Sequence, residues 1–254
     1  MSFTAIVLAG SRPGRDAFAE SFGTDLKALI PVDGRPMVTR PVKALIESPS
    51  VGQIIVLSQA PERIGTALPE ESRVTSRQSL GTIAETMLAL CNDASVQWPL
   101  LVTTADHALL DAATVDEFCR ETAGADVALG VVERANLIRR LPQARRTWLK
   151  FRGGVYTGAN LFALRSPAVA PAIDLWRSVE KDRKKAWRII SLLGPTTLML
   201  AALRLISLDE ILASLSGRLG LSVNAVRLSN PLAGVDVDKA EDHALAESIL
   251  RGEA

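Results

Sequence analysis

The sequence predicts an α/β protein in which a mixed, mostly parallel central sheet lies between two helical layers, as a three-layer α/β/α sandwich. Short apolar runs such as 4–9 and 51–57 are typical of strands buried on both faces of a parallel sheet. Between them, segments such as 37–47 carry apolar residues along one helical face. A long helix-type stretch over 167–222 interrupts this alternation. We therefore expect a single domain over 1–254 with a helical insertion at 167–222.

The remaining elements follow from the same two periodicities. After the first strand, a turn at Asp33-Gly34 precedes the helix over 37–47. Further strands are expected at 72–75, 99–109, 126–132 and 222–227, and residues 150–165 are interpreted as a glycine-rich approach to another strand. Further helices are expected at 61–68, 82–91, 112–122, 134–150 (with loop) and 238–251. Strand and helix thus alternate along most of the chain, which is the pattern of a βαβ sheet.

Composition excludes several classes of function. The 254 residues carry a net charge of only +1, and aromatic residues make up 4%, so we expect no nucleic-acid partner. The first residues lack a basic signal-type segment, and no apolar run reaches the length of a membrane span. Cys91 and Cys119 fall in helix-like apolar patterns and are interpreted as reduced core residues. These observations indicate a cytoplasmic protein.

A glycine-rich basic loop follows the first apolar strand. Residues 8–15 read Leu-Ala-Gly-Ser-Arg-Pro-Gly-Arg, so Gly10 and Gly14 alternate with Arg12 and Arg15. Small residues let backbone N–H groups approach phosphate oxygens, and guanidinium groups bind the same oxygens in a fork. The alternative is an ordinary strand-to-helix turn that uses glycine for its backbone angles.

Two later positions are also of interest. Lys27 lies in an apolar setting after the long loop. Gly81-Thr82 opens a predicted helix, where free N–H groups and a hydroxyl suit a base edge or a phosphate. The alternative for Thr82 is a plain helix N-cap.

Aspartates at strand ends are the candidate metal ligands. Asp106 ends a buried strand, and ligands of open α/β sheets lie beyond the carboxyl ends of the strands. Carboxylates suit Mg²⁺, although Asp106 could instead cap the helix at 112–122. Late in the chain we favour Asp236 as the second metal ligand and Asp238 as the N-cap of the last helix, with Glu241 in the capping-box position. His107 is interpreted as a neighbour rather than a ligand.

Two basic segments have open interpretations. Arginines over 134–150 could grip an acidic substrate, but a solvated helix face explains most of them. The region 176–206 is basic at one end and apolar at the other. We favour a helical subdomain that packs on the sheet or forms a homodimer over peripheral contact of an amphipathic helix with a membrane surface.

The ordered set of motifs resembles the nucleotidyltransferases with a Rossmann-like, glycosyltransferase-A-like fold, the superfamily of MobA-like NTP transferases and sugar-phosphate nucleotidyltransferases. Their opening Leu-Ala-Gly-Gly-x-x-x-Arg is matched at 8–15, with Ser11 in place of the second glycine. Leu80-Gly81-Thr82 and Gly234-Val235-Asp236 match later motifs of the superfamily. The resemblance covers about 4–166 and 222–250.

The resemblance implies a role for each matched position. It implies that the triphosphate contacts Arg15 and Lys27, and that Mg²⁺ is held by Asp106 and Asp236. The nucleotide would contact Leu8, Ala9, Gly10, Ser11, Gly81 and Thr82. The acceptor pocket would include Tyr156, Thr157 and Gly158, with Tyr156 standing where an asparagine is usual.

The implied reaction is the Mg²⁺-dependent transfer of a nucleoside monophosphate from CTP, UTP or GTP to a phosphorylated acceptor, with release of pyrophosphate. The acceptor would be a small molecule or a lipid headgroup, in the cytoplasm or at the inner face of the membrane. Two alternatives remain open: a glycosyltransferase that uses a sugar nucleotide, and a nucleotide-binding module without catalysis.

Overall fold

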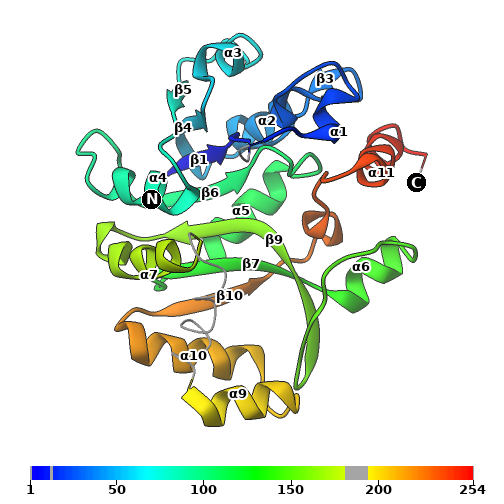
Figure 1. The fold of residues 1–254 in the computed structure, drawn as a ribbon. Helices are drawn as coiled ribbons and strands as arrows, with labels where there is room; N and C mark the ends of the chain where they lie inside the picture. Colours follow the sequence, from blue (N-terminus) through cyan, green and yellow to red (C-terminus); the bar gives the residue numbers. More distant parts are fainter. Residues whose placement is uncertain (1, 12–13, 181–193, 254) are drawn as a thin grey trace.

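The computed structural model describes residues 2–11, 14–180 and 194–253, and it is built around one eight-stranded sheet (Figure 1). The strands run in the order β10-β7-β9-β6-β1-β4-β5, and β8 pairs with β9. Their bounds are β1 Phe3–Leu8, β4 Val51–Ser58, β5 Val74–Gln78, β6 Leu100–Thr104, β7 Val127–Glu133, β8 Leu149–Phe151, β9 Gly154–Leu164 and β10 Val223–Arg227. A separate small hairpin pairs β2 (Pro31–Val32) with β3 (Arg35–Pro36).

The sheet is mixed and mostly parallel, as predicted. Strand β1 pairs in parallel with β4 and β6, and β10 pairs in parallel with β7. Strand β9 runs antiparallel between β6 and β7. In this register Leu8 lies opposite Leu57 on one side and Thr104 on the other, so the carboxyl ends of β1, β4 and β6 are adjacent. Any ligand of this edge would therefore contact the loops that follow all three strands.

Helices cover both faces of the sheet, which confirms the three-layer architecture (Figure 1). One face packs against α2 (Thr39–Glu47), α5 (Ala112–Glu121), α6 (Arg134–Arg140) and α11 (Ala240–Leu250). The opposite face packs against α4 (Ile83–Cys91), α7 (Ala170–Glu180) and α10 (Leu208–Leu219). The remaining helices among the described residues are α1 (Ala17–Glu20), α3 (Pro61–Gly65) and α9 (Gly194–Ala202), with 3-10 turns η1 (Lys27–Leu29), η2 (Pro167–Val169) and η4 (Pro231–Gly234).

The stretch 167–222 is described in part. Helix α7 packs on α4, and α10 packs on β10 with Leu208 and Leu212 against Val223. Residues 181–193, which hold the basic end of the predicted amphipathic segment, lie outside the described residues. Within the described part, Met199 and Leu203 are exposed apolar side chains. Membrane contact and dimer formation stay predictions. In the described ranges, no helix combines the length and apolarity needed to cross a membrane.

Both cysteines are unpaired and lie in or against the core. Cys119 is buried and Cys91 is half-buried. Burial raises the pKa of the Cys119 thiol to about 12, and the nearby charge of Asp116 acts in the same direction. A thiol with this pKa stays protonated near neutral pH and does not act as a nucleophile.

Candidate active site

The glycine-rich loop is held against the end of β4 by Gln59, a residue that the sequence analysis did not select. The amide of Gln59 accepts the backbone N–H of Ser11 at 3.0 Å and donates to the Ser11 carbonyl at 3.0 Å. A Cβ at Gly10 would lie 3.0 Å from the same amide. Glycine at this position therefore allows the loop to lie directly on Gln59. No periodicity marks Gln59; only its place just after a buried strand could have indicated it.

The segment that contains Gly81-Thr82 adjoins this loop. The side chain of Gln78 donates to the carbonyl of Gln59 at 3.3 Å, and Ser79 N–H donates to the carbonyl of Ser58 at 2.8 Å. The loops after β1, β4 and β5 are thus connected at one edge of the sheet. The predicted nucleotide-binding positions Leu8, Ala9, Gly10, Ser11, Gly81 and Thr82 all belong to these loops or to the end of β1.

Thr82 is the N-cap of α4. Its hydroxyl accepts the N–H of Glu85 at 3.3 Å, and the Glu85 carboxylate accepts the N–H of Thr82 at 2.9 Å. This capping box corresponds to the alternative weighed for Thr82. Gly81 has a φ of +44°, and a Cβ there would lie 2.1 Å from Oε2 of Glu85. Gly81 is therefore required by the cap whether or not a nucleotide contacts it.

Arg15 lies at the surface. Its guanidinium pairs with Glu20 at 2.8 Å, and 87% of the side chain is exposed. The residues before it, 12–13, lie outside the described part of the chain. Arg15 forms no contact with Lys27 or with the aspartates described next, so the structure does not bring these two predicted triphosphate ligands together.

Lys27 and Asp106 are in direct contact. Nζ of Lys27 donates to Oδ2 of Asp106 at 2.7 Å, and the hydroxyl of Thr104 donates to Oδ1 at 2.5 Å. Asp106 follows the carboxyl end of β6 by two residues, and Lys27 is the first residue of the turn η1. Burial lowers the pKa of Lys27, but the charges of Asp106 and Asp238 outweigh it and raise the pKa above its ordinary value.

The late aspartates lie at the same place, but Asp238 does not have the helix-capping role predicted for it. The N–H of Val237 donates to the carbonyl of Asp106 at 3.0 Å, which joins the segment 235–238 to the end of β6. The carboxylate of Asp238 accepts Nζ of Lys27 at 2.5 Å. The N-cap of α11 is Lys239, which makes no side-chain cap bond, so the prediction that Asp238 caps this helix is wrong.

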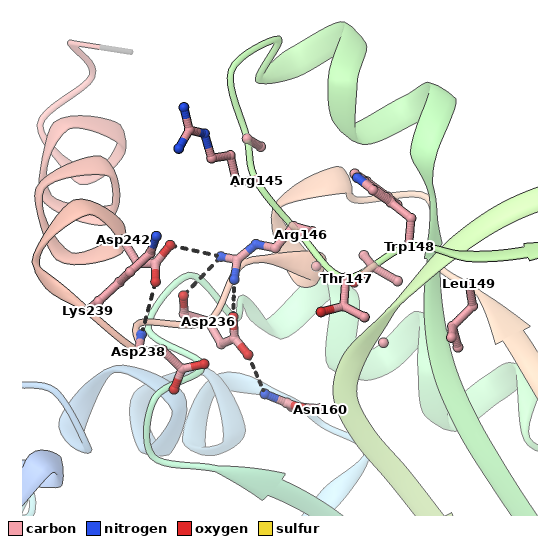
Figure 2. A pocket seen from close by; sticks show the side chains of 14 residues that line it. Arg145, Arg146, Thr147, Trp148, Leu149, Asn160, Asp236, Asp238, Lys239 and Asp242 are labelled. Carbon is pink, nitrogen blue, oxygen red and sulfur yellow. Dashed lines mark hydrogen bonds and ion pairs between the residues drawn. The ribbon is translucent and has the colours of Figure 1, made fainter.

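Asp236, predicted as a metal ligand, is engaged by other partners (Figure 2). Arg146 donates to its carboxylate and, at 2.9 Å, to its carbonyl oxygen. Nδ2 of Asn160 donates to the other carboxylate oxygen at 3.3 Å. Burial raises the pKa of Asp236, Arg146 opposes this shift, and the charges of Asp238 and Asp106 add to it. Asp238 is therefore better placed than Asp236 to share a cation with Asp106.

Arg146 is a residue that the sequence analysis underrated. Only 10% of its side chain is exposed, and it also lies 3.8 Å from the carboxylate of Asp242. It links the loop after α6 to the segment before α11 (Figure 2). The cluster of arginines over 134–150 has no period that distinguishes this buried member from its solvated neighbours.

A cavity of about 730 Å³ opens beside these aspartates (Figure 2). Thr157 and Gly158, which the resemblance assigns to an acceptor pocket, line it together with Asn160 and Asp238. The loop after α6 forms the other wall. The full lining set is Ala144, Arg145, Arg146, Thr147, Trp148, Leu149, Thr157, Gly158, Asn160, Gly234, Asp236, Asp238, Lys239 and Asp242.

Tyr156 does not line this cavity, contrary to the prediction. Successive residues of a strand point to opposite faces, and Tyr156 points away from the face that carries Thr157. Its ring is buried beneath α10 with Leu208 and Leu212. Its hydroxyl lies 3.4 Å from Nε of Arg227, so both ends of the side chain are occupied by structural contacts.

The donor set fits a hard divalent cation that arrives with a substrate. Across 2–11, 14–180 and 194–253, no three His, Cys, Asp or Glu side chains gather as a metal-binding group. Mg²⁺ is commonly held by only one or two carboxylates together with substrate phosphates. Asp106 and Asp238, which already share one cation, provide such a pair.

The chain belongs to the family of MobA-like NTP transferase domains, whose model matches residues 5–193. A comparison with curated proteins gives no match.

Solved structures agree with this assignment. The chain is 30% identical to a hypothetical transferase from Thermus thermophilus, with a TM-score of 0.81 over 96% of this chain and 100% of that one. It shares the fold, at 10% identity, with a 4-diphosphocytidyl-2C-methyl-D-erythritol synthase from Anaerococcus prevotii (TM-score 0.61; 98% and 96% covered). It also shares the fold, at 10% identity, with a CMP:2-keto-3-deoxy-manno-octonic acid synthetase complexed with CTP (TM-score 0.59; 100% of both chains).

Proposed function

We propose that this protein transfers a nucleoside monophosphate from an NTP to the phosphate of an acceptor and releases pyrophosphate. The observation that carries the proposal is the position of Lys27 between Asp106 and Asp238. This group lies where the end of β6 meets the segment before α11, and Asp238 also lines the cavity. A donor nucleotide on the glycine-rich loop and an acceptor in the cavity would therefore meet at these charges.

The reaction requires the protein mainly to align the two substrates and to neutralise the charge of their phosphates. An oxygen of the acceptor phosphate attacks the α-phosphorus of the NTP, and the bond from that phosphorus to the bridging oxygen of the β-phosphate breaks. The attacking oxygen is already anionic near neutral pH, because a phosphate monoester has a second pKa of about 6. Catalysis then rests on alignment and on neutralising the phosphate charge.

Each residue of the site has a role in this scheme. The loop 8–11, held by Gln59, would bind the nucleotide through its backbone N–H groups. Lys27 would bind the triphosphate, and Asp106 and Asp238 would hold Mg²⁺, whose charge would stabilise the phosphates when bound. Arg15 is exposed and can reach a phosphate only by leaving Glu20.

The acceptor would enter the cavity beside Thr157 and Gly158. Arg145 lines that cavity next to the tethered Arg146, and among the described residues it has no hydrogen bond or ion pair. A guanidinium at a cavity wall that makes no hydrogen bond suits a phosphate of the acceptor, although Arg145 is also attracted to Glu241. The CTP complex of one structural neighbour supports testing CTP beside UTP and GTP.

The test is pyrophosphate release from each common NTP against a panel of sugar, alditol, pterin and lipid-headgroup phosphates. We expect release with at least one pair, and its loss in Asp106→Asn. The control Asp25→Asn removes an exposed carboxylate that pairs with Arg63 and should behave as wild type. Release of a nucleoside diphosphate from a sugar nucleotide would instead indicate a glycosyltransferase. Nucleotide binding without turnover across the panel would indicate a binding module.

A further inference from the structure

Lys27 fills the space that faces both carboxylates of the site. Its ammonium lies 2.7 Å from Oδ2 of Asp106 and 2.5 Å from Oδ1 of Asp238. The side chains of Lys27 and Asp106 are only 21% and 19% exposed, so water screens this contact little, whereas the Asp238 side chain is 63% exposed and its contact is screened more. The ammonium of Lys27 is thus the cation that the carboxylates of Asp106 and Asp238 share.

The same position cannot hold this ammonium and a divalent cation together. A Mg²⁺ ion bound by both carboxylates requires oxygens about 2.0–2.1 Å away. The ammonium already makes hydrogen-bond contact with both oxygens, and a second cation there would also repel its charge. Free Mg²⁺ therefore has to displace Lys27, and Lys27 then loses both of its partners.

From this competition, which rests on the proposed function, we infer that Lys27 makes the site select the magnesium–nucleotide complex over free magnesium. In the nucleotide-free protein, Lys27 holds the gap between Asp106 and Asp238. A triphosphate offers the ammonium new anionic partners, so Lys27 leaves the gap only when a nucleotide arrives with its cation.

The surroundings allow this exchange without a change of fold. Asp106 is fixed independently of Lys27, because Thr104 donates to its Oδ1 and Val237 donates to its carbonyl. The backbone of Asp238 is fixed by its N–H, which donates to Asp242 at 3.3 Å. Lysine has a flexible four-carbon stem, so its ammonium can move while the turn η1 stays in place.

The experiment uses Mn²⁺ as a probe for Mg²⁺, followed by the electron paramagnetic resonance signal of free Mn²⁺. Titrations compare wild type and Lys27→Met, each with and without a non-hydrolysable NTP analogue, and the Mn²⁺ that the analogue binds without protein is measured and subtracted. Wild type should bind Mn²⁺ tightly only with the analogue. Lys27→Met should bind Mn²⁺ without nucleotide roughly tenfold or more tightly than wild type, because a competing charge at contact distance is gone.

Three further variants test whether the position of Lys27, rather than its charge alone, is responsible. Lys239→Met removes the same charge from the same end of the site, where Lys239 pairs with Glu241 at 2.7 Å, and should leave nucleotide-free Mn²⁺ binding close to wild type. Adding Asp238→Asn to Lys27→Met should abolish the gain. Asp238→Asn alone keeps the Lys27–Asp106 pair and serves if Lys27→Met does not fold; it should lose the analogue-dependent Mn²⁺ binding.

Equal nucleotide-free Mn²⁺ affinity in folded wild type and Lys27→Met would overturn the inference, as would an equal gain in Lys239→Met. Analogue-dependent binding that survives in Asp238→Asn would also overturn it. None of these measurements requires turnover. A gain in Lys27→Met, together with analogue-dependent Mn²⁺ binding by wild type and no pyrophosphate release in the substrate panel, would support the Lys27 exchange and reject the proposed reaction.

Discussion

Val237 and Asp106 are joined by a backbone hydrogen bond of 3.0 Å, although 131 positions (237 − 106) separate them in the chain. The bond brings the acidic segment before α11 to the carboxyl end of β6. It uses the carbonyl oxygen of Asp106, so the carboxylate of that residue is left for Lys27 and Thr104. The backbone carbonyl of Asp106 therefore has a structural role, and its carboxylate is the group proposed to take part in the reaction. A side-chain substitution can change the second without the first.

The first prediction uses that separation. Asp106→Asn keeps the backbone bond and the side-chain oxygen that accepts from Thr104, but it removes the negative charge. We expect pyrophosphate release to fall by roughly 10²–10³-fold, as for the loss of one strong electrostatic contact to a transition state. The melting temperature should stay close to wild type. Turnover that persists at the wild-type rate in the folded variant would contradict the assigned role.

The second prediction concerns the bond between Gln59 and the glycine-rich loop. Gln59→Ala removes both hydrogen bonds to Ser11 and should loosen the loop without disturbing β4. We expect the KM for NTP to rise several-fold with little change in kcat, because the loop binds the nucleotide in ground state and transition state alike.

The control for this loop variant comes from the same strand. Gln53→Ala changes an exposed glutamine of β4 at the end remote from the loop and should leave the KM for NTP unchanged. Steady-state kinetics over NTP concentration measure both variants. An unchanged KM in Gln59→Ala, or an equal rise in Gln53→Ala, would show that Gln59 does not position the nucleotide loop.

How far sequence predicts this structure depends on which physical signal is strong. Strands β1, β4 and β6 were predictable because they are short apolar runs, and Ile6, Ile55 and Leu101 are indeed buried. The rule that ligands lie beyond strand carboxyl ends selected Asp106, whereas Lys27 was assigned to the same ligand through the resemblance to the nucleotidyltransferases. Strong local patterns therefore predicted the fold and one residue of the proposed site.

Contacts that depend on tertiary position were not predictable. Asp236 and Asp238 are two residues apart, and sequence alone does not say which one meets Arg146 and which meets Lys27. Tyr156 stands where the acceptor motif usually has an asparagine, and the pleat of β9 turns its ring under α10. Such choices depend on neighbours that are distant in the chain, which a periodicity cannot reveal.

The third prediction concerns the pair of Arg146 and Asp236. Arg146→Met would leave the Asp236 carboxylate without its main partner in a largely buried site. Breaking a buried pair costs about 3–5 kcal/mol, and because Asp236 keeps 29% of its side chain exposed we expect about 2 kcal/mol here. Adding Asp236→Asn should restore part of the free energy of unfolding.

Denaturant unfolding of the single and double variants measures this coupling. The neighbouring Arg145→Met removes an exposed arginine and should change stability by less than about 0.5 kcal/mol. If Arg146→Met is no less stable than Arg145→Met, then Arg146 does not hold the loop after α6 to the segment before α11. Retained nucleotide-dependent Mn²⁺ binding in Asp236→Asn would agree with Asp238 as the partner of Asp106.

The fourth prediction is a pH dependence of stability that arises at His107. The ring is 1% exposed, Nδ1 lies 3.3 Å from the hydroxyl of Thr103, and burial lowers its pKa from 6.5 to about 4, although the charge of Asp106 opposes the shift. Folding therefore favours the neutral ring. The contribution of His107 to the free energy of unfolding should be complete above pH 6.5 and should decrease as the pH falls toward 4, by at most roughly 3 kcal/mol.

The check is the difference in denaturant stability between about pH 7 and about pH 5 for wild type and His107→Gln. The other titrating groups contribute equally to both proteins and cancel, so the variant should show a shallower fall. An identical fall in both proteins would mean that His107 becomes protonated as readily in the folded chain as in the unfolded one.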